Sequence, residues 1–357
     1  MGVVCKSGGV KMSQLFGKNS KGEEVYIYTL KNESGMMVRF LNLGATVHEL
    51  FVPGKDGQSV QVSAIYDDPL SYERETTYFG AIVAPYANRI SDAKFEIDGQ
   101  IYETDANNNE NSLHSGINGI AKKIWTVKEQ TENKIVFTYD AKDLEQGFPG
   151  NIHYEVTYEV TEKNELSISY YALSDKKTTI NMTNHTYFNL AGALSGSVEG
   201  QELWIKASHY TPVKDAKAIP TGDIAPVDGT PFDFREAKAI GRDIRQDFDQ
   251  LVYGQGYDHN FAIDKASVGF EKIATAYAQE TGIQMDVWTD CIGVQLYTGN
   301  FMAGQKGPNE HTYVKHGAFC LETQYFPNAI NETNFVCPIT EANVPYETRT
   351  VYAFSVR

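Results

Sequence analysis

Apolar and polar residues alternate in short stretches along most of the 357-residue chain, and an alternation of period two is typical of β-strands. It is clearest in residues 154–160 and 165–171. Turn residues separate neighbouring runs, and the Asp98-Gly99 pair indicates a two-residue hairpin turn. Strands and hairpins are predicted at residues 24–30, 36–41, 45–51, 59–65, 94–102, 124–139 and 153–172. The pattern therefore predicts an antiparallel meander.

Helices are predicted at only two places. Residues 68–73 form a short connector, with Asp67 or Asp68 as its N-cap and Pro69 at its first helical position. Residues 239–251 are the other helix candidate. Residues 191–234 are rich in Gly, Pro and Asp, and such a stretch forms turns that border a site.

The strand pattern continues without a disordered linker, so residues 19–357 are predicted to form one large antiparallel β-domain. Residues 1–18 mix Gly, Lys and Ser without periodicity and are interpreted as a loose N-terminal leader.

Residues 179–190, read as a strand, have two faces of different character. One face is mostly apolar and suits a core. The other face is polar and carries no formal charge, and it consists of Thr179, Asn181, Thr183, His185, Tyr187 and Asn189. Amides, hydroxyls and an imidazole suit the binding of a neutral polyol. We therefore expect a sugar site here, with His185 as a proton-transfer group.

Other segments carry candidate chemistry. In residues 317–325, Glu322 shares a strand face with Cys320 and is the lone carboxylate there, which makes it a candidate general base. Asp258, His259 and His114 lie at predicted strand or turn edges, where ligand-binding residues concentrate. Gln295 and Tyr297 form a second uncharged polar face.

Each of these residues also has an ordinary structural explanation. His185 could be a hydrogen-bonded structural histidine, Glu322 could form a buried ion pair with Arg89, and Asp258 could cap a turn. Residue types and spacing alone indicate a β-protein with a sugar site and leave these alternatives open.

Composition narrows the function classes. The formal net charge of −15 argues against a nucleic-acid partner, which needs a basic surface. The 22 tyrosines and 18 phenylalanines favour strands and also suit carbohydrate sites. The four cysteines lack the spacing of a metal site or a disulfide framework. No apolar segment reaches membrane-spanning length, so a cytoplasmic protein with reduced thiols is predicted.

Several motifs together resemble the aldose 1-epimerases, also called galactose mutarotases. The likeness runs in the same order from about residue 20 to the C-terminus, with one departure at Ala84-Pro85, where the family often has Gly-Arg. The matching segments are residues 88–90, 111–114, 184–190, 219–222, 229–234, 256–261, 295–300 and 321–324.

The resemblance implies an all-β fold, a large antiparallel β-sandwich of the galactose mutarotase-like supersandwich type with few short helices. It implies neither a cofactor nor a metal. Glu322 would be the general base that removes the proton from the anomeric hydroxyl, and His185 the general acid that protonates the ring oxygen. The remaining contacts to the sugar would come from Asn88, Arg89, His114, Asp258 and Gln295.

The function implied is that of an aldose 1-epimerase that interconverts the α and β anomers of free hexoses such as galactose and glucose. Its partner would be this small substrate, and the protein would be a monomer or a homodimer. A hexose-6-phosphate 1-epimerase would need a basic cluster, and the motifs offer only Arg89. A non-catalytic sugar-binding module would not need the Glu322 and His185 pair. In the enzyme we expect mutual attraction to keep Glu322 ionised and His185 protonated.

Overall fold

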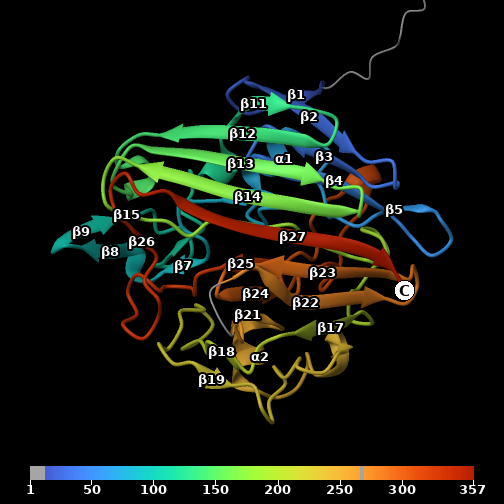
Figure 1. Ribbon diagram of the computed structural model, residues 1–357. Coiled ribbons are helices and arrows are strands. Elements are labelled where there is room, and N and C mark those ends of the chain that lie inside the picture. Colours follow the sequence, from blue (N-terminus) through green and yellow to red (C-terminus); the bar gives the residue numbers. More distant parts are fainter. Residues whose placement is uncertain (1–12, 266–268) are drawn as a thin grey trace, which may run out of the picture.

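The computed structural model describes residues 13–265 and 269–357 (Figure 1). Its largest element is a sheet of nine strands in the order β11-β12-β13-β14-β27-β23-β22-β17-β20. These strands are β11 (Thr126–Gln130), β12 (Lys134–Ala141), β13 (Ile152–Val160), β14 (Glu165–Ser174), β17 (Glu202–Ile205), β20 (Lys238–Ala239), β22 (Glu271–Ala278), β23 (Ile283–Thr289) and β27 (Tyr346–Val356). The last strand of the chain, β27, pairs with β14 and β23 and so joins early hairpins to late ones.

A second sheet of five strands lies behind the long strands in Figure 1. Its strands are β1 (Ser13–Lys18), β2 (Glu24–Lys31), β3 (Met37–Leu41), β4 (Thr46–Pro53) and β5 (Ser59–Gln61). Buried and half-buried residues alternate along β13, as the sequence predicts. Its inward Tyr158 packs on Phe40 of β3, with ring centroids 4.5 Å apart, and its hydroxyl donates to the Ala45 carbonyl at 2.6 Å. The core therefore lies between the two sheets.

A third sheet positions the pocket described below. It has the order β19-β18-β21-β24-β25. Its strands are β18 (His209–Tyr210), β19 (Ala225–Pro226), β21 (Asp258–Ala262), β24 (Gly293–Tyr297) and β25 (Cys320–Gln324). Every residue of β24 and β25 is buried, so both faces of these strands are covered.

The other elements are short. Four two-stranded ladders pair β6 (Ile82–Val83) with β16 (Thr183–Asn184), β7 (Arg89–Ile90) with β10 (Ser112–Leu113), β8 (Lys94–Ile97) with β9 (Gln100–Glu103), and β15 (Thr178–Thr179) with β26 (Ile339–Thr340). The helices are α1 (Pro69–Arg74), α2 (Asp249–Gly254) and the 3-10 turns η1 (Ser91–Ala93), η2 (Ile120–Lys122), η3 (Glu145–Gly147), η4 (Ile240–Arg242) and η5 (Pro308–Glu310). The predicted all-β architecture with few short helices is confirmed.

The structure agrees with the predicted helix where the sequence has a clear capping residue. The predicted connector is α1, where the Asp68 carboxylate accepts a hydrogen bond from the Ser71 amide at 2.9 Å. The helix predicted at residues 239–251 is wrong in extent. The chain there forms η4, a turn closed by the Gln246 amide on the Asp243 carbonyl, and only then α2.

The predicted strand at residues 179–190 is also different in the structure. It is broken into β15 and β16, and both of its faces are buried. Its amides bond to neighbouring backbone, since Asn184 donates to the Gly80 carbonyl at 2.8 Å and Asn189 to the Gly317 carbonyl at 2.9 Å. Loops on either side therefore satisfy polar groups that the pattern assigned to an open face.

The predicted leader lies mostly outside the described residues. Its described part, Ser13–Lys18, is not loose, because it forms β1 and pairs with β2. Within the described part of the chain, no helix has the length and apolar character needed to cross a bilayer.

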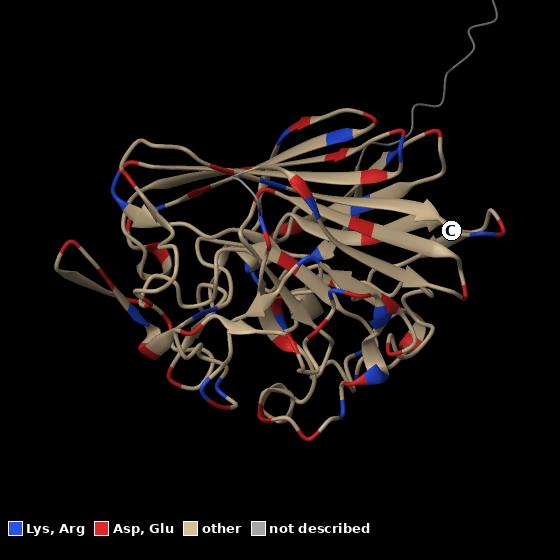
Figure 2. Cartoon of the chain, turned by 60° about the horizontal axis from the view of Figure 1, so that its bottom comes forward, with Lys and Arg blue, Asp and Glu red and all other residues tan. Residues whose placement is uncertain are grey.

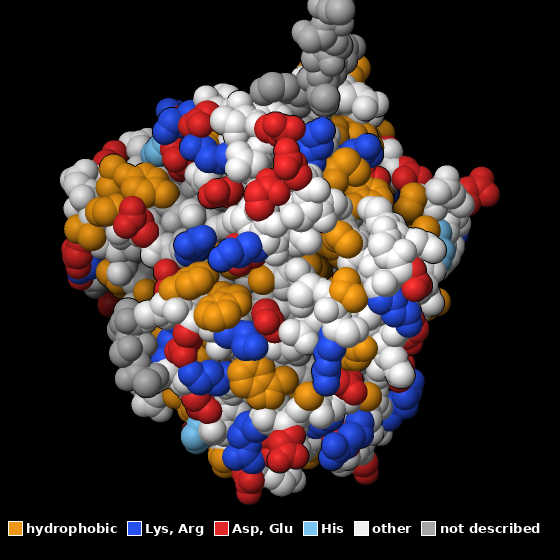
Figure 3. Space-filling view, turned by 45° about the vertical axis from the view of Figure 1, so that its right-hand side comes forward, with side chains coloured by type: hydrophobic (Ala, Val, Ile, Leu, Met, Phe, Trp, Pro, Cys, Tyr) orange, Lys and Arg blue, Asp and Glu red, His pale blue; other side chains and the backbone are white. Residues whose placement is uncertain are grey.

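Charged residues of both signs are dispersed over loops and strands (Figure 2). Hydrophobic and basic side chains are intermixed on the side shown in Figure 3. The Arg349 guanidinium lies 5.1 Å from the Phe270 ring centroid, and the Lys272 ammonium lies 5.9 Å from that of Trp204. In such cation–π contacts a cation lies over the face of an aromatic ring.

Candidate active site

A cavity of about 360 Å³ opens beside the third sheet. Its volume is in the range of small-molecule sites. Six of the seven residues predicted to act on a sugar line it, namely Asn88, Arg89, His114, His185, Asp258 and Glu322. They come from β7 and the residue before it, from β21 and β25, and from the connections after β10 and β16, so segments far apart in sequence meet in one pocket.

Glu322 is placed by the strand register. It lies at the centre of β25, opposite Gln295 of β24, and Leu321 beside it points into the core. Gln295 in turn lies opposite Asn260 of β21, the strand that begins with Asp258. Three neighbouring strands therefore fix the carboxylate in a rigid setting.

His185 and Glu322 face each other across the floor of the pocket. The Nε2 atom of His185 lies 3.6 Å from Oε2 of Glu322, an ion-pair distance that is longer than a hydrogen bond. The residues are only 5% and 2% exposed. Oε2 has no hydrogen-bond partner among the described residues. An imidazole and a carboxyl group are thus held close together at one point of the cavity.

Burial dominates the charge of both groups. It lowers the pKa of His185 to about 4. Burial, and then the Asp258 carboxylate, raise the pKa of Glu322 well above its usual range, while the Arg89 guanidinium lowers it. Both pKa shifts oppose the expectation that mutual attraction keeps Glu322 ionised and His185 protonated, because burial disfavours the charged form of each group.

His114 is held in one tautomer. The backbone amide of Asn88 donates to its Nδ1 at 3.2 Å, so the ring proton lies on Nε2. Burial, with the neighbouring His185 and Arg89, lowers the pKa of His114 well below its usual range. The ring centroids of His114 and His185 are 5.1 Å apart. His114 is therefore a neutral hydrogen-bond donor beside the pair.

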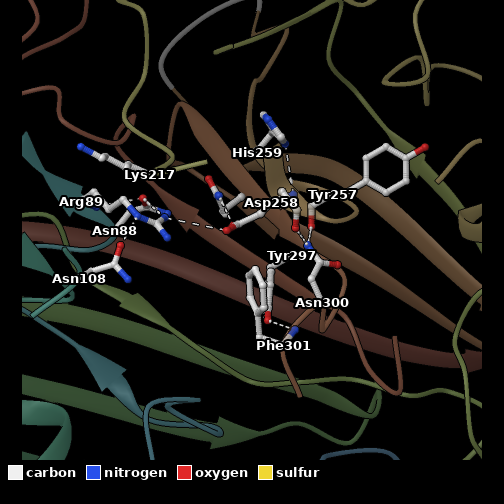
Figure 4. Close-up of polar contacts among 12 residues, drawn as sticks. Asn88, Arg89, Asn108, Lys217, Tyr257, Asp258, His259, Tyr297, Asn300 and Phe301 are labelled. Carbon is white, nitrogen blue, oxygen red and sulfur yellow. Dashed lines mark hydrogen bonds and ion pairs between the residues drawn. The ribbon is translucent and has the colours of Figure 1, made fainter. Parts of the chain in front are cut away.

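Arg89 and Asp258 form the polar wall of the pocket (Figure 4). Arg89 lies 3.9 Å from the Asp258 carboxylate, and its Nε donates to Asn108 at 3.1 Å. Within the described residues, Arg89 forms its ion pair with Asp258 and not with Glu322, so the alternative pairing is not formed. Gln295 does not line the cavity, and its amide donates to Asp258 at 2.7 Å. It thus orients the carboxylate from beneath.

His259 is explained by structure. Its Nδ1 accepts the Asp258 amide at 3.2 Å, and its Nε2 lies 3.2 Å from the Gln250 side chain. The ring packs against Phe232 with centroids 4.7 Å apart. Both ring nitrogens are engaged away from the cavity.

Sequence reasoning missed much of the aromatic and amide lining. The missed residues include Tyr78, Asn107, Asn108 and Phe301, and Phe301 is 56% exposed. The Phe301 amide donates to the Tyr297 hydroxyl at 3.0 Å, which ties this rim to β24 (Figure 4). The polar loop at residues 107–112 was visible in sequence, but its place in the pocket was not.

The donor atoms of His114, His185 and Glu322 lie within 4.8 Å of one another. Imidazole and carboxylate are also donor types that divalent metals use. The metal-free site inferred from the sequence therefore stays a prediction.

Comparison with known proteins places the chain in a family. The sequence model of the aldose 1-epimerase family matches residues 26–353. The chain is 37% identical to the Homo sapiens galactose mutarotase over 322 residues, 90% of this chain and 92% of that protein. It is 38% identical to the Haemophilus influenzae aldose 1-epimerase over 313 residues, 87% of this chain and 89% of that protein.

Solved structures agree. The aldose epimerase homologue from C. elegans superposes with a TM-score of 0.86 at 27% identity, covering 92% of this chain and 98% of that one. The galactose 1-epimerase from Lactobacillus acidophilus gives 0.81 at 25% identity, covering 94% and 96%. The resemblance stated from the motifs is confirmed, and the chain belongs to the aldose 1-epimerase family.

Proposed function

We propose that this protein interconverts the α and β anomers of free hexoses such as D-galactose and D-glucose. The observation that carries the proposal is the buried pair of Glu322 and His185 on the floor of the cavity, 3.6 Å apart. The named activity of the relatives, which share more than a third of their residues with this chain, supports it.

The reaction needs two proton transfers. The anomeric hydroxyl must lose its proton to Glu322 while the ring oxygen gains one from His185, and the ring then opens to the aldehyde. A half turn about the bond between the first two carbons exposes the other carbonyl face. The hydroxyl formed from the ring oxygen then attacks that face of the carbonyl, and the two proton transfers run in reverse. His114 donates a hydrogen bond from Nε2 to the ring oxygen of the sugar and stays neutral.

Burial raises the pKa of Glu322 and lowers that of His185, so it favours the state in which the pair shares one proton and the carboxyl group holds it. Moving that proton from Glu322 to Nε2 of His185 creates the carboxylate base and the imidazolium acid together. The 3.6 Å separation requires the groups to approach by a few tenths of an ångström. The ring of Tyr187 stacks on His185 at 5.0 Å and 15°, and its π face favours the imidazolium.

The polar wall holds the other hydroxyls. Arg89 supplies donors and Asp258 supplies acceptors, and Asn88 and Asn108 add amides. Both charges are already opposed at 3.9 Å, which suits a neutral ligand better than a phosphate dianion. Lys217, drawn in Figure 4, is likewise paired with Glu110, at 2.5 Å. We therefore rank a sugar phosphate below a free hexose.

Polarimetry on freshly dissolved α-D-galactose, α-D-glucose and α-D-galactose 6-phosphate tests this order against a buffer blank. We expect faster approach to anomeric equilibrium with the free sugars and little effect on the phosphate. Acceleration confined to the phosphate would contradict the ranking. A protein that binds galactose but matches the blank with every sugar would be a binding module.

A further inference from the structure

His185 has a second neighbour that the proton-transfer scheme has not used. Cys320 begins β25 two residues before Glu322, so the thiol and the carboxylate lie on the same strand face. The sulfur lies 3.5 Å from Nδ1 of His185, and Glu322 lies 3.6 Å from Nε2. The imidazole therefore sits between a thiol and a carboxyl group supplied by one strand.

The backbone of His185 is fixed as well. Its amide donates to the Ala81 carbonyl at 2.9 Å, and its own carbonyl accepts the Gly80 amide at 2.9 Å. Burial lowers the pKa of His185 to about 4, and a contact of the ring with its own backbone offsets part of that effect. The Cys320 sulfur is the neighbour of Nδ1 that comes from another residue.

We propose that Cys320 is a positioning residue whose sulfur accepts the Nδ1–H of His185 and so leaves the Nε2 lone pair facing Glu322. The inference rests on the proposed function of the pocket. Only with Nε2 free can the ring take the Glu322 proton directly and then pass it to the sugar. When the carboxyl group carries its proton on Oε2, the opposite tautomer would place two protons against each other across the 3.6 Å gap.

A thiol suits this task because sulfur is a weak acceptor. Burial, with Glu322 and Asp258, raises the pKa of Cys320 well above its usual range, so the sulfur stays neutral. A neutral sulfur orients Nδ1–H without removing the proton. The titratable groups that surround His185 are Tyr78, His114, Tyr187, Tyr297, Cys320 and Glu322.

Three variants separate this role from simple packing. Cys320→Ala removes the acceptor, Cys320→Ser restores an oxygen that can accept, and Cys291→Ala is the matched control. Cys291 is also a buried cysteine with a raised thiol pKa, but it contacts Thr289 instead of His185. Thermal unfolding of each variant checks that the fold is retained.

We expect Cys320→Ala to lower kcat about tenfold, the effect of one lost hydrogen bond to a charged group, with KM within about twofold. Removing the acceptor destabilises the imidazolium form of His185 more than the neutral form. The acid limb of the pH–rate profile therefore moves to lower pH. Cys320→Ser should recover most of the activity, and Cys291→Ala should match wild type. Wild-type kcat and pH profile in Cys320→Ala, or a Cys320→Ser variant as slow as Cys320→Ala, would overturn the proposal.

Nitrogen-15 NMR of histidine-labelled wild-type protein tests the tautomer without any turnover. We expect the neutral His185 ring to carry its proton on Nδ1, and assignment by comparison with His185→Asn identifies its signals. A proton on Nε2 would overturn the inference. Because this readout needs no substrate, it is separate from any failure of the epimerase proposal, and the same spectra of Cys320→Ser show whether the acceptor at this position sets the tautomer.

Discussion

Replacing Glu322 by Gln should stabilise the protein while it abolishes most of the activity. The native carboxyl group is 2% exposed, and burial raises its pKa well above the ordinary value of 4.5. Above pH 4.5 the unfolded chain releases this proton and the native state keeps it. At this site the native state then binds more protons than the unfolded state, so the contribution of Glu322 to wild-type stability falls as pH rises. Gln has no such proton.

The magnitude follows from the pH interval. Each pH unit between 4.5 and the raised native pKa of Glu322 costs wild type about 1.4 kcal/mol. The stability gain of Glu322→Gln should therefore be near zero at pH 4.5 and grow by up to about 1.4 kcal/mol per pH unit until the pH reaches that native pKa.

Urea unfolding of wild type and Glu322→Gln at pH 5, 6, 7 and 8 measures this difference. Glu132→Gln is the control, because Glu132 is a 77% exposed carboxylate whose removal should change stability by less than about 0.5 kcal/mol. A Glu322→Gln variant that is less stable than wild type at pH 8, or a difference that does not change with pH, would refute the assignment of a buried, protonated carboxyl group.

Three further predictions concern pH and binding. The enzyme should lose activity below about pH 4, where His185 takes up a second proton, and also above the raised pKa of Glu322. An acid limb that has already lost its activity at pH 6.5 would contradict the burial argument. Asp258→Asn should raise KM at least tenfold and move the basic limb to lower pH, because a carboxylate that raises the pKa of Glu322 is removed; an unchanged profile by polarimetry would contradict this. Burial lowers the pKa values of His48 and His259 to about 3, so below pH 6.5 the unfolded chain binds protons that the native state does not. Urea unfolding of Glu322→Gln, which lacks the opposing carboxyl group, should show stability falling as the pH is lowered, by up to about 1.4 kcal/mol per pH unit for each histidine, and a flat dependence between pH 6.5 and 4.5 would contradict this.

Most of the sheet structure could be predicted because it is encoded locally. Alternation in residues 154–160 and 165–171 and the Asp98-Gly99 turn correspond to the hairpins β13–β14 and β8–β9. The stretch at residues 179–190 has the same alternation but a different outcome. Its amides bond to the Gly80 and Gly317 backbone, and no local pattern shows that loops from distant parts of the chain cover both faces.

The sequence was enough to predict several of the residues that form the site, but not the protonation of Glu322 and His185. Motif resemblance named six residues that line one cavity, but it could not show that Gln295 lies beneath Asp258 instead of facing the ligand. It also assigned ordinary charge states to Glu322 and His185. Their pKa values depend on how deeply the strands bury them, which is a property of the assembled sheets.

The most direct test of the account is the turnover of Glu322→Gln on α-D-galactose, measured by polarimetry beside wild type and Glu132→Gln. We expect the Glu322→Gln variant to lose about 10²–10⁴-fold in kcat while it remains folded, because the general base is gone. Glu132→Gln should match wild type. A folded Glu322→Gln protein that turns over galactose at the wild-type rate would contradict the central role of the Glu322 and His185 pair.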